Sequence, residues 1–219
     1  MKIVAMNTVP SRLLAWAWAL IAAAALTGCA TGMGKDECVA ADWRTIGYED
    51  GLHGYPADRI GAHRVACARH QVTPNLAAYT DGRQRGLVEY CQPKNGFRVG
   101  LHGGGYANVC SGPTEQSFVN GYQWGRQIYE ARSELNNNQA RVRNARDGLA
   151  KTDAAIASAT SELLLPNLPK ERRIFLAQEL VQLGQERTEF VSRIENLTAR
   201  TQQLAFNVQQ LERQSPYPL

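Results

Sequence analysis

Seven side chains in the glycine-rich part of this sequence could take part in acid–base or metal chemistry. They are Asp42, Glu49, Asp50, His53, His63, Asp81 and His102. On a helix, Asp50 and His53 would share a face and could act as an acid–base pair. His63 and Cys67 would also share a face and could bind a metal ion. Because the chain carries none of the common hydrolase, metalloprotease or phosphate-binding motifs, we expect no catalytic residue, no metal and no cofactor.

The first 28 residues predict export. Lys2 and Arg12 stand before or at the start of an apolar run, residues 13–26, which is too short for a confident membrane span and ends in "LTGC". This pattern resembles the lipobox of bacterial lipoproteins, which implies cleavage before Cys29 and acylation of its thiol, palmitate included. Since Ala30 is not aspartate, we expect the outer membrane, on its periplasmic face. An ordinary secretory signal peptide is the alternative.

Cleavage before Cys29 would remove two basic residues and leave a net charge of +2, against +4 for the whole chain. The remaining charges of both signs are interspersed, as on a solvated helical surface. The composition therefore gives no support for nucleic-acid binding, and we expect none.

A spaced set of aromatic residues and glycines recurs through residues 38–129. The sets are Trp43-Gly47-Gly51-Tyr55, Tyr79-Gly82-Gly86-Tyr90, Phe118-Gly121-Gly125-Tyr129 and the shorter Phe97-Gly100-Gly104. Each set would lie on one helical face, where glycine costs roughly 1 kcal/mol against alanine unless a neighbouring helix approaches closely. We predict short helices for the first three sets, and turns for "GLHGGGY" (100–106). In this alignment the two copies of GLHG, at 51–54 and 100–103, are out of register, so His53 and His102 are predicted not to be equivalent.

Four cysteines accompany this repeat: Cys38, Cys67, Cys91 and Cys110. An even number in an exported chain indicates two disulfides. A zinc site is the alternative, but the sequence has no CxxC pair. We predict an antiparallel pair of helices, 41–54 and 57–70, which would bring Cys38 beside Cys67 and leave Cys91 to pair with Cys110. A third helix is expected to begin at Thr73 and Pro74.

From Ile128 onward the period becomes seven. Large residues recur at Ile128, Leu135, Val142, Leu149, Ile156 and Leu163, and a second series runs from Leu176 to Leu211 beyond two prolines. If the series pair antiparallel, Asn138 faces Thr201 and Thr152 faces Arg187, so the polar residues coincide. We therefore predict an intramolecular coiled-coil hairpin, with an oligomeric coiled coil as the alternative.

The glycine-rich part resembles a known family of bacterial lipoproteins, catalogued as domain of unknown function 2799. The residues that carry the resemblance, over about 29–129, are Asp42-Trp43, Asp50-Gly51, Gly82-Arg83, Gly86-Leu87 and Tyr90-Cys91, together with a histidine at the His63 position. The resemblance implies no reaction, substrate or cofactor.

The expected fold is mainly α: a small disulfide-stapled domain of short Gly-rich helices, followed by a long antiparallel coiled-coil helical hairpin. We divide the chain into a signal peptide (1–28), a tether (29–37), the stapled domain (38–129), the hairpin (130–213, turn near 166–169) and a tail (214–219). The expected role is a lipid-anchored, non-enzymatic envelope protein whose hairpin binds a protein partner. The alternatives are a glycan- or anion-binding surface at Arg83, Arg85, Arg126 and Trp124, and a hydrolase built on Asp50 and His53.

Overall fold

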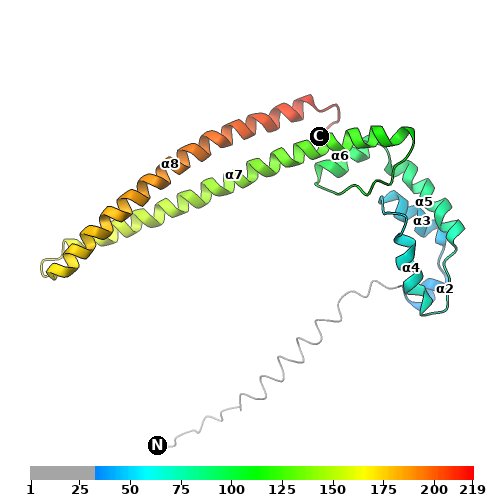
Figure 1. Ribbon diagram of the computed structural model, residues 1–219, viewed down its shortest axis with the longest axis horizontal. Helices are drawn as coiled ribbons and strands as arrows, with labels where there is room; N and C mark the ends of the chain where they lie inside the picture. The colour runs from blue at the N-terminus through cyan, green and yellow to red at the C-terminus, as the bar shows by residue number, and fades with distance from the viewer. Residues whose placement is uncertain (1–32) are drawn as a thin grey trace, which may run out of the picture.

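The computed structural model describes residues 33–219, and every regular element in that range is a helix (Figure 1). The elements are α2 (Lys35–Val39), α3 (Trp43–Leu52), α4 (Arg59–Ala68), α5 (Leu76–Tyr90), α6 (Pro93–Leu101), α7 (Pro113–Leu163) and α8 (Lys170–Gln214). Helices α2 to α6 gather with the beginning of α7 at one end of the molecule, and α7 and α8 extend from them as a long arm. The mainly helical fold with a terminal helix pair is as predicted. The proposed lipidation site Cys29 and the leader lie outside the described residues.

Local signals set the helix starts. Asp42 caps α3, because its carboxylate accepts hydrogen bonds from the Arg44 amide (3.0 Å) and the Thr45 hydroxyl (2.7 Å). These bonds, that from Thr45 first, lower the pKa of Asp42. Helix α5 begins later than predicted: its N-cap is Asn75, whose side chain accepts from the Ala78 amide, so Pro74 lies outside the helix.

Helices α3 and α5 run parallel and touch through their glycines. A methyl group built on Gly47 or Gly51 of α3 would meet the α5 backbone, at Tyr79 and Arg83 respectively, well inside 3.0 Å. The reverse holds for Gly82 and Gly86 of α5, which would meet the α3 backbone. The two backbones are therefore packed directly against each other, which is the compensation expected for glycine inside a helix.

Helices α6 and α7 repeat this arrangement. Gly96 and Gly100 of α6 lie against the backbone of α7, and Gly121 and Gly125 of α7 lie against the backbone of α6, again in parallel. The phenylalanine set that begins at Phe118 is therefore not the predicted short helix but belongs to the first turns of the 51-residue α7. Residues 33–219 thus contain two copies of one unit, the parallel glycine-packed helix pair.

The prediction that His53 and His102 are not equivalent is wrong. Each lies at the end of the first helix of its pair, and its ring Nδ1 lies 2.7–2.8 Å from the carbonyl oxygen four residues earlier. The glycine that follows has a positive φ, +69° at Gly54 and +74° at Gly103, and an aromatic ring covers each. The spacing aligned Phe97-Gly100-Gly104 with the second helix of each pair. In the structure α6 is the first helix of its pair, and its packing glycines are Gly96 and Gly100. The turn predicted for the three consecutive glycines holds only after Leu101.

Two disulfides fasten the units, Cys38–Cys67 and Cys91–Cys110, the same pairs that the sequence predicts. The first joins α2 to the last turn of α4 in a cluster with Trp43 and Tyr79. The second joins the end of α5 to the loop before α7, beside Tyr90 and Phe118. Helix α2 crosses the expected boundary between the tether (29–37) and the stapled domain (38–129). From here on the stapled domain means residues 33–129.

The hairpin pairs in the predicted register. Asn138 donates from its amide to the Thr201 hydroxyl (2.9 Å) and to the Leu197 carbonyl (2.8 Å), so the buried amide is satisfied. Ala145 packs with Val142 and Leu197. Arg187 does not stay in the seam opposite Thr152, because its guanidinium pairs with Asp153 at 2.8 Å near the surface. Helix α7 has no break between the stapled domain and the hairpin.

The end of the chain returns to the stapled domain. Beyond α8, the Tyr217 ring stacks on Phe97 of α6, with centroids 5.0 Å apart and planes 20° from parallel. Phe97 is 4% exposed. Both helices of the hairpin are therefore fixed to the domain, α7 by continuity and α8 by its tail. None of the helices described here combines the length and apolar composition required to cross a membrane.

Candidate functional site

A cluster of polar side chains centred on Asp50 lies where α3, α4 and α5 meet. Its carboxylate contacts the His63 ring nitrogen Nε2 (2.9 Å) and accepts a hydrogen bond from the Tyr79 hydroxyl (2.8 Å). Arg59 lies 3.9 Å from the other carboxylate oxygen. The three helices α3, α4 and α5 each supply a member, so one carboxylate joins all three.

Burial defines what this cluster can do. Asp50 is 7% exposed and Tyr79 is 1% exposed. Burial and the hydrogen bond to Asp50 raise the pKa of Tyr79 well above its usual range, so the phenol stays protonated and donating. The rings of Trp43 and Tyr79 pack edge-on against His63. With so little surface left for a substrate, the arrangement suits a structural network better than acid–base catalysis.

The acid–base pair suggested by sequence spacing does not form. His53 turns its Nδ1 to the Glu49 carbonyl, and Asp50 turns inward to His63 instead. His63 is partly buried and Cys67 is in a disulfide, so these two do not offer a metal ligand pair. Within residues 33–219 no three His, Cys, Asp or Glu side chains gather into a metal-binding set. The Asp50–His63 contact leaves no signal in the sequence, because the partners lie on different helices.

Replacing Asp50 with alanine should lower the unfolding free energy of the stapled domain by about 3 kcal/mol, because it leaves the buried Tyr79 hydroxyl and the partly buried His63 ring without their partner. Urea unfolding followed by Trp43 fluorescence, in a Trp124→Phe background, measures this. Asp81→Ala is the control: its side chain is 42% exposed and pairs with the exposed Arg44 and Arg85, so a change below about 1 kcal/mol is expected. Equal losses in the two variants would contradict a structural role for the buried network.

The arginines considered for an anion-binding surface each have a polar partner within the stapled domain or on their own helix. Arg83 donates to the Tyr55 carbonyl (2.7 Å), and Arg85 pairs with Asp81 (3.3 Å). Arg126 pairs with Glu130 (2.7 Å), and its guanidinium lies over the Tyr129 ring. Trp124 is partly buried on the same helix.

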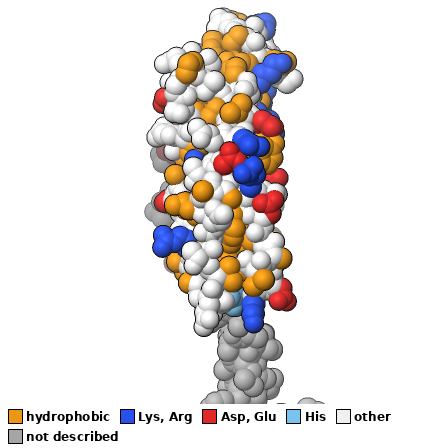
Figure 2. Space-filling view, turned by 90° about the vertical axis from the view of Figure 1, so that its right-hand side faces the viewer, with side chains coloured by type: hydrophobic (Ala, Val, Ile, Leu, Met, Phe, Trp, Pro, Cys, Tyr) orange, Lys and Arg blue, Asp and Glu red, His pale blue; other side chains and the backbone are white. Residues whose placement is uncertain are grey.

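The face of the stapled domain shown in Figure 2 carries basic and acidic side chains side by side, with apolar side chains between them. No field of a single sign covers that face. The arrangement fits a solvated helical surface, on which an arginine packs its stem over an aromatic ring and pairs with a nearby carboxylate.

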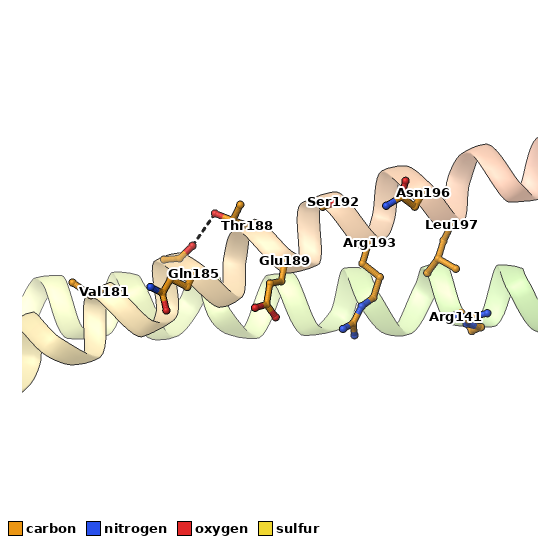
Figure 3. A pocket seen from close by; sticks show the side chains of 10 residues that line it. Arg141, Val181, Gln185, Thr188, Glu189, Ser192, Arg193, Asn196 and Leu197 are labelled. Atoms are coloured by element: carbon orange, nitrogen blue, oxygen red, sulfur yellow. Dashed lines mark hydrogen bonds between the residues drawn. The ribbon is translucent and has the colours of Figure 1, made fainter.

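A shallow groove runs along the hairpin, and α8 supplies most of its lining (Figure 3). Val181, Gln185, Thr188, Glu189, Ser192, Arg193 and Asn196 line it from α8, and Arg141 lines it from α7. Gly184 leaves open space in the lining, because a methyl group there would meet nothing within 4 Å. The lining mixes apolar, polar and charged side chains and holds no histidine or cysteine.

The fold and this cluster define a small disulfide-stapled domain of paired parallel helices, fused to a coiled-coil arm. Residues 42–127 match the model of a family described as "Protein of unknown function (DUF2799)". This segment spans both glycine-packed pairs, and the resemblance drawn from the sequence is confirmed over it. A search of curated proteins and a search of solved structures each found no match.

Proposed function

We propose that this protein is a lipid-anchored envelope protein, without enzymatic activity, that holds a partner protein by means of its hairpin. The observation that carries the proposal is the continuity of α7, which packs on α6 at Gly121 and Gly125 and then pairs with α8 for the rest of its length. An arm rigidly fused to its base can hold a partner at a fixed distance from an anchor.

The tail contact supports the same proposal. With Tyr217 stacked on Phe97, the arm has two connections to the stapled domain rather than one. Ion pairs between α7 and α8, such as Arg132–Glu212 and Arg200–Glu134, add register-specific contacts along the hairpin. A role in holding requires such stiffness, whereas a role in catalysis would require a pocket with reactive groups.

Lipid attachment at Cys29 is the second part of the proposal, and it follows from the leader sequence alone. Cys29→Ser is expected to leave the chain unacylated, so that the processed, acylated species is no longer found in the membrane fraction. If the variant still ran as an acylated species in the membrane fraction, the anchor would be refuted.

The hairpin register allows the arm to be shortened without a mismatch. Deletion of residues 145–158 from α7 together with 181–194 from α8 removes paired heptads and preserves the phase of both seams. A photo-reactive side chain placed at the exposed Asn136, on the retained part of α7, or at the exposed Gln178, near the turn, should crosslink to an envelope protein in cells expressing the full chain.

The shortened chain should still form its disulfides and should lose the crosslinks made from Gln178, because the turn no longer reaches the same distance from the stapled domain. Crosslinks from Asn136, which lies nearer the domain, are expected to remain. Absence of protein crosslinks from both Asn136 and Gln178 in the full chain would contradict the proposal.

A further inference from the structure

The turn of the hairpin exposes a group of large apolar side chains. Leu164 is 79% exposed, Leu165 52%, Ile174 51% and Phe175 54%. They come from the end of α7, the connecting turn and the first turns of α8, which meet at the far end of the arm (Figure 1). We call these four residues the apolar tip. The first described residues lie at the opposite end of the molecule, in the stapled domain.

Several backbone polar groups beneath the apolar tip have hydrogen-bond partners within the protein. The Arg173 guanidinium donates to the carbonyls of Leu163 (3.3 Å), Leu165 (3.0 Å) and Leu168 (3.3 Å). The amides of Leu164 and Leu165 donate to carbonyls of the last turn of α7. Pro166 and Pro169 have no N–H to satisfy. A turn exposed to water does not need such internal hydrogen bonds, because water supplies donors and acceptors.

The charged side chains near the tip are largely paired with one another. Glu162 is held by Arg172 through two hydrogen bonds, of 2.6 and 2.7 Å, which also lower the pKa of that carboxyl. The Arg172 guanidinium lies 5.1 Å from the centre of the Phe175 ring. Of the other charged residues near the tip, Lys170 and Arg173 are basic and Glu171 is acidic, so the tip carries a small positive excess.

We propose that the apolar tip inserts into the interfacial region of a lipid bilayer that carries anionic headgroups. In hydrocarbon, each unsatisfied backbone group is costly, so a turn that inserts must satisfy its carbonyls and amides internally. Arg173 meets this requirement at the carbonyls of Leu163, Leu165 and Leu168, and the two prolines remove two amides that would otherwise need an acceptor. Leucine, which contributes two of the four tip residues, is under-represented among the dominant residues of protein interfaces, and its aliphatic surface suits lipid. The basic excess favours an anionic surface.

This inference does not depend on the Cys29 anchor or on a protein partner of the hairpin. It places a membrane contact at the end of the arm opposite the point where the chain enters the fold. If the anchor also exists, the protein has a lipid contact at each end and could bridge two bilayer surfaces, or two regions of one.

Vesicle flotation of the chain from residue 30 to 219, which lacks the anchor and contains every described residue, tests the inference. The chain is expected to float with vesicles of phosphatidylethanolamine and phosphatidylglycerol, and more weakly with phosphatidylcholine alone. Leu164→Asp with Leu165→Asp should lower the bound fraction by at least about tenfold, because two side chains no longer favour burial. Val181→Asp with Phe206→Asp is the matched control: both residues are similarly exposed on α8 but lie away from the tip, so binding should be unchanged.

Arg173→Lys separates backbone satisfaction from charge. Lysine keeps the positive charge but cannot donate in the same fork to three carbonyls, so weaker flotation with an intact circular dichroism spectrum is expected. A Phe175→Trp variant should show a blue-shifted emission on adding anionic vesicles. The inference is overturned if the unmodified chain floats with neither vesicle, if the tip and control variants lose binding equally, or if the tip captures a protein while vesicles stay unbound.

Discussion

Gly82→Ala is expected to lower the free energy of unfolding of the stapled domain by roughly 3 kcal/mol, a large effect for one added methyl group. The new Cβ would fall on the backbone of α3, at the Arg44 carbonyl, well inside 3.0 Å. Backbone atoms cannot rotate away as a flexible side chain can, so α3 and α5 would have to separate along their whole contact. All four packing glycines of this pair would then lose their contact with the backbone of the partner helix.

The control lies in the same domain. Gly61 is also helical, in α4, but a methyl group there would meet nothing within 4 Å. Gly61→Ala should therefore stabilise the domain by about 0.5–1 kcal/mol, through helix propensity alone. Urea unfolding followed by the fluorescence of Trp43, which is buried beside the pair, measures both variants. Similar behaviour of the two alanines would show that close packing is not what selects glycine at position 82.

The second pair offers an independent repeat of the experiment. Gly121→Ala in α7 should be as destabilising as Gly82→Ala, since the added methyl group would meet the α6 backbone at Pro93 in the same way. Trp124, one turn away on α7, reports on this unit in a Trp43→Phe background. A small effect at Gly121 together with a large one at Gly82 would contradict the equivalence of the two units.

Loss of the Cys38–Cys67 disulfide is expected to cost about 3.5 kcal/mol, from the loop entropy of a bridge that spans 29 residues. Both cysteines are almost completely buried, at 1% and 0% exposure, so replacement by serine adds a polar-burial cost. Helix α4 has few other connections: the His63 contact with Asp50 is its main polar one. Amide hydrogen exchange in residues 59–68 should therefore accelerate in the Cys38→Ser, Cys67→Ser variant.

The other bridge serves as the comparison. Cys91–Cys110 spans 19 residues, for which the same model gives about 3 kcal/mol, and its loss should accelerate exchange in residues 102–112 instead. Neither change should alter exchange in the outer half of the hairpin, which contacts neither bridge. Exchange that increased uniformly along α7 and α8 in both variants would mean that the arm depends on the stapled domain for its stability.

Local signals in the sequence were sufficient for the hairpin. The heptad spacing, the prolines near 166–169 and the coincidence of Asn138 with Thr201 predict both helices and their register, because a buried polar side chain needs a partner at the same level of the seam. The continuity of α7 was also readable in principle. Residues Phe118, Gly121, Gly125 and Ile128 already follow three- and four-residue steps, and no proline lies between Pro113 and Pro166.

The cysteine pairing and most helices of the stapled domain followed from the sequence in the same way. The glycine faces predicted close helix packing, because nothing else offsets their cost in a helix. They did not show which helix meets which, since a glycine face is equally open to any neighbour. That ambiguity produced the misalignment of the two GLHG segments. The predicted antiparallel pairing of helices 41–54 and 57–70 is wrong, because α3 packs in parallel along α5 instead of along α4.

Only the tertiary structure decided three matters: the equivalence of His53 and His102, the pairing of Asp50 with His63, and the exposure of the apolar tip. Each depends on where separate helices come to lie. A spacing of three residues suggested that Asp50 would meet His53, but the return of α4 brings His63 to the same carboxylate, and burial with Tyr79 favours that contact. The sequence by itself determined the helical periodicity and the disulfide pairing, which depend on spacing along the chain. Contacts among three helices, and the surfaces they leave uncovered, arise only when the whole chain has packed.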